Sequence, residues 1–588
     1  MKLIEISMND NIEHQEIISS FNELEKLDEI TSQLDFEIEN RFQKNMYLKI
    51  IPELSKRLNN IHNQSYPEKY WEQIIGLEIL MHIHHCRDIL KKIKKIRDKK
   101  YKIKIIKPKN YYIPKNSSDY RLFTQHRDFG HAQLLSIYEC EYNNNLIYCD
   151  TVYDNSINKI NKKKYFKFFS LIKKILTKKT EIIFILIRRI LSLFLRYIIK
   201  PRLLLVQTIF TNLYYIKLMI LSLGKIQILN DLELKDDRSH ERIDSISRKK
   251  MSKTHSNFNN FEKFFFLTLF HFTPKSWIES YGFKYNKNKS ILKKYGNINY
   301  VVSESSSEEA HFFLANASNV GIKVLYNEHN FLQQFILGNT IWFHLRNCDK
   351  FLSLGWSSIS SKKVIPLGSL YQWSTKKKKE NIEILFISSV ASKKFPLYSA
   401  AYGEQGYSKA LSYFDMNIKF FSNLENSIIS KIYFRGHPHV KKKLYSGYVI
   451  DDNLYLNKYL NEFSTVDYSS HNSAVNLISQ SKLVIINYLS TPWLQSLVSN
   501  VPTIILLNKD VYYVDQSYIS FFDLLIKNNI IFTSAASAAQ FVNSISDNPN
   551  IWWNSKNVQN ARSKFLDSNF MVKQQLSKFL VKLSGEIE

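Results

Sequence analysis

The 588-residue sequence is poor in the residues that break or cross-link a chain. It contains only 14 glycines and 12 prolines. Its four cysteines, Cys86, Cys140, Cys149 and Cys348, are scattered without the spacing of a zinc site or a disulfide framework. The first 40 residues are rich in acidic side chains and contain no apolar segment of the kind found in a secretory signal. We therefore expect a reduced protein located in the cytoplasm.

The sequence also lacks long apolar runs and has few acids for its number of bases. In and beside the basic segment 159–202, the longest uncharged run, residues 203–216, is shorter than the ~20 residues that a membrane-spanning helix needs. There are 81 Lys and Arg against 53 Asp and Glu, which gives a net charge of +28. Such a charge suits phosphorylated substrates, anionic lipid or nucleic acid. No helix-turn-helix, zinc-finger or RNA-recognition pattern accompanies it, so we expect no specific nucleic-acid partner.

A metal site is not expected either. His82, His84 and His85 lie close together in a helical pattern, but they lack the i, i+4 spacing of helical metal ligands and a suitably placed acid. The chain is too long for one hydrophobic core and, at 44% hydrophobic residues, can form several.

The most informative pattern lies in residues 483–507. Leu483 to Ile486 is an apolar, β-branched run typical of a parallel strand buried on both faces. Thr491 and Pro492 then have the chemistry of a helix start, and 503–507 is the next buried run. The pattern predicts a β-α-β unit with a right-handed crossover.

Polar residues follow two of the predicted strands. Ser490 and Thr491 stand at the start of the helix, where unpaired backbone N–H groups favour an anion. Arg435 and His437 follow the apolar run 432–434, and both can bind a phosphate. Under the alternative interpretation, the hydroxyls only cap the helix and Arg435 pairs with a surface acid.

A second β-α-β pattern precedes this one. Residues 299–302 and 323–326 read as strands, and 308–317 between them suits a helix. The second strand leads into the polar turn 327–330.

Residues 159–202 differ in kind from the rest of the chain. They contain fourteen Lys or Arg and one acid, Glu181, interleaved with Phe, Leu and Ile. Such a stretch is typical of an anchor that lies on an anionic membrane surface without crossing it. The alternative is an inserted helical pair that packs on the first domain and whose lysines reach solvent from its edge.

Several of these motifs together resemble a family of bacterial transferases encoded among lipopolysaccharide O-antigen genes. The residues that carry the resemblance are Phe434 to Pro438, the unit 483–502, Trp552 to Lys556, Tyr70-Trp71 with Gly76, Asp349 to Leu352, and Gly355-Trp356. The resemblance covers most of the chain, thinly before Tyr66 and across 155–260.

The resemblance implies an α/β, GT-B-like fold with two Rossmann-type domains, a helical N-terminal region and a basic helical insertion. The boundaries expected are 1–100 for the helical region, 101–348 for the acceptor domain with an insertion at about 155–260, 349–545 for the nucleotide-donor domain, and 546–588 for C-terminal helices that return to the first domain.

The resemblance also implies roles for single residues. A His-Pro loop followed by a Ser/Thr pair is similar to bacterial sialyltransferases, Kdo-type transferases and teichoic-acid glycerophosphotransferases, in which these motifs hold the phosphate of a cytidine nucleotide. It implies donor binding by Arg435, His437, Ser490 and Thr491. Gln495 stands where the family has a glutamate that, in GT-B enzymes, commonly holds the donor ribose, so the ribose contact is made by an amide or is weakened.

Glu328 or His329 is the expected general base, because GT-B-like acceptor domains often offer a His or Glu at such a strand end. The family turn reads as Gln-His-Gly, so only His329 corresponds to it. The alternative is that His329 only forms hydrogen bonds within its own loop and takes no part in catalysis.

These observations predict a glycosyltransferase-like enzyme that transfers a sugar or sugar-like acid from a nucleotide-activated donor, cytidine-linked by resemblance, to a surface-glycan or lipid-linked acceptor. No DxD-like metal motif stands at a strand end, so metal-independent catalysis without a cofactor is expected, in the cytoplasm or peripherally on the inner face of the cell membrane. A CDP-glycerol-type glycerophosphotransferase on the same fold, and a non-catalytic basic protein with a degenerate Rossmann core that binds a membrane surface or nucleic acid, remain the alternatives.

Overall fold

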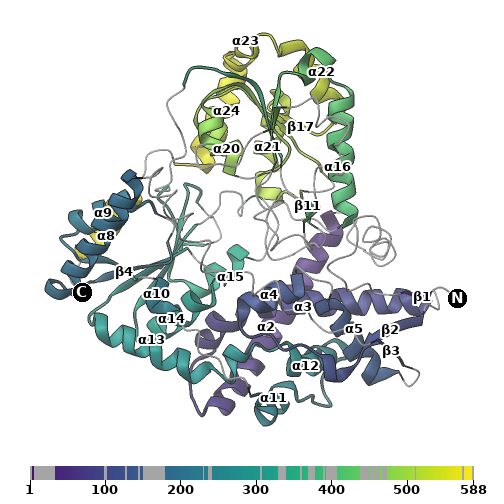
Figure 1. Cartoon of the computed structure of the whole chain (residues 1–588), viewed down its shortest axis with the longest axis vertical. Helices are drawn as coiled ribbons and strands as arrows, with labels where there is room; N and C mark the ends of the chain where they lie inside the picture. The colour runs from purple at the N-terminus through teal and green to yellow at the C-terminus, as the bar shows by residue number, and fades with distance from the viewer. Residues whose placement is uncertain are drawn as a thin grey trace.

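Two six-stranded parallel sheets and a separate helical region make up the chain (Figure 1). This computed structural model describes residues 3–4, 33–98, 102–149, 179–235, 242–357, 361–388, 391–392, 407–436, 473–571 and 575–585, with short internal gaps, and a few residues between 449 and 465. The two-sheet α/β architecture expected from the sequence is confirmed.

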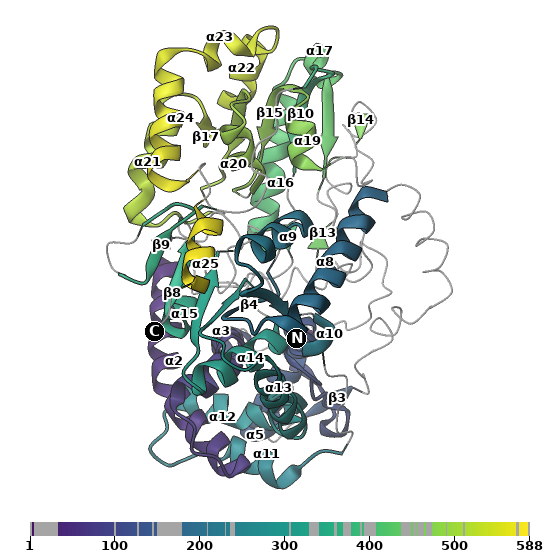
Figure 2. The same ribbon diagram turned by 90° about the vertical axis from the view of Figure 1, so that its left-hand side faces the viewer.

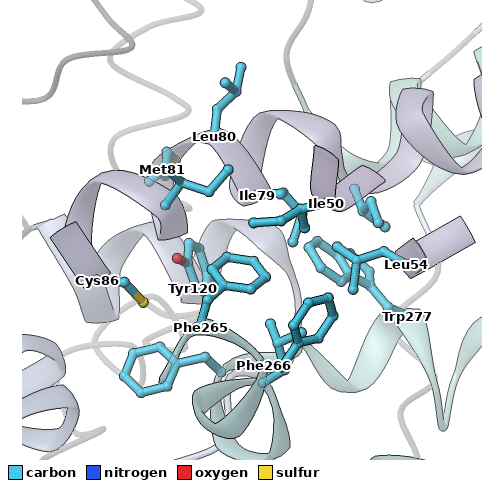
Figure 3. Packing of buried hydrophobic residues seen from close by; sticks show 14 of the residues in the cluster. Ile50, Leu54, Ile79, Leu80, Met81, Cys86, Tyr120, Phe265, Phe266 and Trp277 are labelled. Carbon is cyan, nitrogen blue, oxygen red and sulfur yellow. The ribbon is translucent and has the colours of Figure 1, made fainter. Parts of the chain in front are cut away.

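The helical region is built on two long antiparallel helices, α2 (Gln33–His62) and α3 (Glu68–Asp98). Their facing apolar side chains, among them Ile50, Leu54 and Ile79, are buried together in the core that Figure 3 shows. The shorter helices α4 (Ser117–Gln125) and α5 (Phe129–Tyr142) close one side. A small parallel sheet flanks them, formed by β1 (Leu3–Ile4), β2 (Lys102–Ile106) and β3 (Ile147–Cys149).

This core also takes in a later part of the chain. Helices α11 (Ser245–Ser252), α12 (Asn260–Phe272) and α13 (Tyr281–Tyr295) follow the first strands of the first large sheet. From α12, Phe264, Phe265 and Phe266 are buried against α2 and α3. The helical region is therefore discontinuous in sequence.

The first large sheet has the strand order β5-β4-β6-β7-β8-β9, and all its pairs are parallel. Its strands are β4 (Leu203–Val206), β5 (Ile226–Leu229), β6 (Tyr300–Ser303), β7 (Lys323–Asn327), β8 (Lys350–Ser353) and β9 (Val364–Pro366). Alternate residues of β4 are buried on opposite faces. Leu203 and Leu205 meet α9 (Asn212–Leu221) and α25 (Leu576–Gly585), whereas Leu204 and Val206 meet α13 and α14 (Glu308–Asn319).

Three details differ from the expected boundaries. Strand β2, expected to open the first Rossmann-type domain, pairs in the small sheet instead. The expected insertion at 155–260 contains β4 and β5, because a short apolar run buried on both faces of a parallel sheet looks the same in sequence as a buried helix. Residue 349 does not begin the second domain, since β8 and β9 continue the first sheet.

The second large sheet has the order β14-β12-β10-β15-β16-β17, again with every pair parallel. Its strands are β10 (Ile382–Ile387), β12 (Ile432–Arg435), β14 (Ser464–Thr465), β15 (Ser481–Ile486), β16 (Thr503–Leu506) and β17 (Ile531–Phe532). The helices on its two faces are α16 (Tyr407–Ser422) and α22 (Ala535–Ile545) on one, and α20 (Thr491–Val498), α21 (Ile519–Lys527) and α24 (Lys556–Asn569) on the other. The predicted unit of strand, helix and strand over 483–507 is confirmed as β15, α20 and β16.

The chain returns from the second sheet to the first after α24. Phe570 forms an antiparallel bridge with Gly355, and the Met571 amide donates to the Leu354 carbonyl at 2.9 Å. Helix α25 then lies on the first sheet, where Leu576 and Leu580 are fully buried (Figure 2). Of the C-terminal helices, α25 packs on the first sheet, whereas α24 packs on α20 and α21 of the second.

Gly355 is required at the point where the two crossing segments meet. Its φ is +139°, and a Cβ there would lie 2.1 Å from the Met571 nitrogen. We expect Gly355→Ala to lower the free energy of unfolding by about 1–3 kcal/mol, because both the backbone strain and the clash fall on backbone atoms. Thermal and urea unfolding measure this. Gly282→Ala, in a helix where the added methyl meets nothing within 4 Å, is the matched control and should be neutral. Equal stability of the two variants would contradict the conclusion that glycine is required at position 355.

Candidate active site

The carboxyl ends of three central strands of the second sheet lie side by side. Ile387 of β10 is in register with Arg435 of β12 on one side and with Ile486 of β15 on the other. With neighbouring strands ~4.8 Å apart, Arg435 and the end of β15 are separated by roughly 10 Å. Arg435 and the start of α20 therefore leave the same edge of one sheet, as the sequence predicted.

Arg435 has an unused hydrogen-bond donor at this edge. Its side chain is half-buried, and its buried Nε has no hydrogen-bond partner. Within the described residues no acid forms an ion pair with it, so the surface-pairing alternative finds no support there. A guanidinium fixed at a strand end with a free donor suits a phosphate or carboxylate.

Helix α20 brings Thr491 and Gln495 to the same place. Trp493, Leu494 and Leu497 are completely buried in the second core and fix the helix against β15 and β16. Thr491 and Gln495 are half-buried and, being four residues apart, lie one above the other on the helix. His437 and Ser490, the other two predicted donor residues, lie outside the described residues, so the shared phosphate site stays a prediction.

A buried polar network lies between these two edges, and the sequence reasoning missed most of it. Asn487, directly after β15, donates to Ser388 Oγ at 3.3 Å and to Asn417 Oδ1 at 3.0 Å. Ser388 Oγ and the Tyr413 hydroxyl are 3.0 Å apart. Ser388, Asn417 and Asn487 are almost fully buried, so they fix the strand ends that carry the site and are not exposed contacts. An asparagine directly after a buried strand was the available signal.

The first sheet presents Glu328 at the carboxyl end of β7. The side chain is only 2% exposed. Its Oε2 accepts hydrogen bonds from the Leu354 amide and from the Trp356 indole, both at 2.8 Å, and its Oε1 has no partner. Burial raises the pKa of Glu328 to about 8, against the lowering effect of the two hydrogen bonds.

Further polar groups that the sequence reasoning missed lie beside Glu328. The Asn327 amide donates to Glu304, which follows β6, while Asn327 Oδ1 is buried without a partner. Gln207, which follows β4 at a φ of +48°, accepts from Ser307, the N-cap of α14. The strand order reverses between β4 and β6, and open α/β sheets bind ligands at such a point. An acid two residues after the strand pattern at 299–302 was the signal for Glu304.

The two domains meet close to Glu328. Phe335 packs edge to face with Tyr518 of the second domain, with ring centroids 4.8 Å apart, and its carbonyl accepts from the Asp515 amide at 2.7 Å. Burial, and then the charges of Asp515 and Glu328, raise the pKa of Tyr518 to about 12. His329 lies outside the described residues, and its role as a base stays a prediction.

The described residues contain no group of three or more His, Cys, Asp or Glu side chains arranged to hold a metal ion. His82 belongs to the helical core. Its ring nitrogens lie 3.1 Å from the Tyr120 hydroxyl and 2.7 Å from Thr268 Oγ1, and burial lowers its pKa to about 3.

A family comparison decides the class of the protein. The model of the LIC12162 family of transferases matches residues 10–583, nearly the whole length. The chain belongs to the LIC12162 family of transferases. The residues that match the family model include the helical region and both large sheets. No curated protein sequence matches it.

Solved structures resemble this LIC12162-family chain only weakly. The wall teichoic acid polymerase TagF aligns with 72% of the chain and 97% of its own at 12% identity and a TM-score of 0.33. MurG of Acinetobacter baumannii aligns with 66% of the chain and 100% of its own, at 10% identity and a TM-score of 0.32. The glycosyltransferase SnogD of Streptomyces nogalater aligns with 65% of the chain and 100% of its own, at 12% identity and a TM-score of 0.33. Likenesses of this size assign neither donor nor acceptor.

The buried carboxyl of the LIC12162-family protein makes stability depend on pH. A pKa raised from 4.5 to about 8 keeps Glu328 protonated in the folded state while it ionises in the unfolded state. The resulting stabilisation is complete below pH 4.5 and is lost between pH 4.5 and 8, by up to roughly 5 kcal/mol. Glu328→Gln can keep both hydrogen bonds and cannot ionise. We therefore expect this variant to gain stability over the wild type as the pH rises from 5 to 8.5.

Urea unfolding at several pH values measures the difference. Glu425→Gln, which removes an exposed carboxylate far from the site, is the control and should follow the wild-type curve. A wild-type curve that stays parallel to that of Glu328→Gln across this range would show that Glu328 is ionised in the folded protein.

Proposed function

We propose that this transferase moves a sugar or sugar-like acid from a nucleotide-activated donor to a hydroxyl of a surface glycan of the O-antigen or capsule type. The observation that carries the proposal is Arg435, half-buried with an unused donor at the carboxyl edge of the second sheet. The start of α20 lies at the same edge. Arg435 and the N-terminus of α20 both favour an anion, and a nucleotide diphosphate or monophosphate carries the negative charge that they can bind.

In the proposed step, the acceptor oxygen attacks the donor's anomeric carbon and the bond from that carbon to the phosphate oxygen breaks. The electron pair of the broken bond leaves with the nucleotide phosphate. Arg435, with His437 and the N-terminal amides of α20 beside Ser490 and Thr491, offsets this charge, so we propose that no metal is needed. Gln495, on the exposed side of α20 with Thr491, would contact the donor ribose through its amide.

A base must take the acceptor's proton, and we assign this role to His329. Glu328 is the neighbouring candidate. Its raised pKa leaves the carboxyl largely protonated near pH 7, and Oε2 is already occupied by two donors. We propose instead that Glu328 positions the turn that carries His329.

The acceptor would bind at the edge of the first sheet. Glu304 and Asn327 are almost fully buried, so we propose that their hydrogen bond fixes the ends of β6 and β7 at this edge and that they do not contact the sugar themselves. We further propose that the acceptor is lipid-linked and that the enzyme works in the cytoplasm, at an anionic membrane surface. No helix among the described residues has the length and apolar character needed to cross a bilayer.

The donor site is tested by nucleotide binding. A thermal-shift screen of cytidine, uridine, guanosine and thymidine nucleotides should identify one base that raises the melting temperature. Arg435→Ala should weaken that nucleotide about tenfold to a hundredfold, the cost of losing charge-assisted hydrogen bonds. Lys431→Ala removes a cation at the opposite end of β12 and should leave the affinity unchanged. Equal effects of the two variants would mean that Arg435 does not contact the donor.

The base is tested by turnover and its pH dependence. His329→Ala should lower turnover by ~10²- to 10⁴-fold with little change in nucleotide affinity, because the base contacts the acceptor. If Glu328 were the base, kcat/KM would instead rise with pH up to about 8, and Glu328→Gln would abolish turnover. Melting temperatures serve as the control for folding. Turnover of CDP-glycerol in place of sugar nucleotides would assign the protein to the glycerophosphotransferases.

A further inference from the structure

The outer side of α8 (Lys179–Ile198) and α9 exposes an unusual number of apolar side chains. Twenty large apolar side chains are exposed among the described residues, and twelve of them lie between Ile183 and Leu223. Ile190 is 67% exposed, Phe194 60% and Leu223 75%. Scattered single apolar residues are normal on a protein surface, but a contiguous group marks an interaction site. We call this surface the α8–α9 platform.

The platform is held firmly on its inner side. Tyr215 and Leu218 of α9 are buried against β4 and β5, and α8 packs along α9. The Arg188 guanidinium lies 5.4 Å from the centre of the Tyr215 ring. Among the side chains of α8 that the structure describes, Ser192 alone is buried. Figure 1 shows the two helices at the outer edge of the first domain.

The charge around the platform indicates what covers it. Residues 179–230, which include α8 and α9, contain eight Lys or Arg and one acid, Glu181. In a symmetric dimer the same surface meets itself, which would place these cations against one another with one carboxylate per subunit to neutralise them. An anionic bilayer provides both an apolar interior and negative headgroups.

The platform is also joined to the acceptor edge of the first sheet. The Tyr215 hydroxyl, on the inner face of α9, donates to the carbonyl of Thr208, and Thr208 lies beside Gln207 at the end of β4. A glycan carried on a lipid in the same bilayer would reach this edge without leaving the membrane surface.

We propose that the α8–α9 platform inserts its apolar side chains into the headgroup region of an anionic membrane and so brings a lipid-linked acceptor to the end of β4. The part of this proposal that concerns the acceptor rests on the proposed function. The sequence predicted an anchor at 159–202; residues 159–178 lie outside the described residues, and the proposed contact is formed by exposed isoleucine, leucine and phenylalanine side chains of α8 and α9.

Vesicle binding by the full-length protein tests the proposal. The protein should co-sediment with phosphatidylglycerol–phosphatidylcholine vesicles and less with phosphatidylcholine alone. The double variant Ile190→Gln/Phe194→Gln should bind at least tenfold more weakly, since removing each inserted side chain changes partitioning by roughly tenfold or more. Both side chains are exposed, so the variant should keep the wild-type melting temperature. Ile551→Gln is the control, because Ile551 is even more exposed, at 75%, but lies on α23 (Pro549–Trp553) of the second domain; this variant should bind like the wild type.

Three results would overturn the proposal. The first is a double variant that binds vesicles as tightly as the wild type. The second is binding that salt abolishes fully and that the double variant leaves unchanged, which would mean adsorption by charge alone. The third is a wild-type dimer in sedimentation that the double variant converts to monomers, which would make the platform a subunit interface. Transfer to a short soluble acceptor is measured in parallel and should be equal in all variants. Its absence from the wild type would refute the proposed function while leaving the vesicle result in force.

Discussion

The buried carboxyl group of Glu328 joins the end of the first sheet to the segment that leads to the second. Glu328 accepts from Leu354, which packs in the core of the second domain, and from Trp356, which packs in the core of the first. Loss of either donor would leave a buried acid with an unmet hydrogen-bonding demand. The acceptor edge, the domain junction and the pairing of Gly355 with Phe570 all lie within a few residues of this group. The arrangement of the acceptor edge at the domain junction therefore depends on how this acid is satisfied.

The second sheet and its helix could be predicted because their signals are local. Runs of β-branched residues such as Leu483 to Ile486, followed by a capping residue and Pro492, allow few other structures. Arg435 and Thr491 could be assigned to one sheet edge for the same reason, since parallel strands all end on one side. Their side-chain environment could not be predicted. Asn487 and Asn417, which help to form it, are seventy positions apart in the sequence and meet only in the folded structure.

The first half of the molecule was harder to predict because its contacts are distant in sequence. Leu203 to Val206 is the centre of a sheet whose neighbours lie at 226–229 and 300–303, and the basic residues around it resemble those of a surface insertion. Phe264, Phe265 and Phe266 of α12 pack on helices about two hundred residues earlier. Glu304 and Asn327 are polar partners from different strands, so neither residue alone indicates the pair.

The return of the chain from the second sheet also has a consequence for the order of folding during synthesis. The face of the first sheet that holds Leu203 and Leu205 is closed in part by Leu576 and Leu580 of α25. Until those residues have been made, the ribosome-bound chain carries a complete set of strands for the first sheet with part of one face uncovered. Domains usually fold as units from the N-terminus onward. Here the first domain is begun early and finished last, so the nascent chain exposes apolar surface throughout synthesis of the second domain.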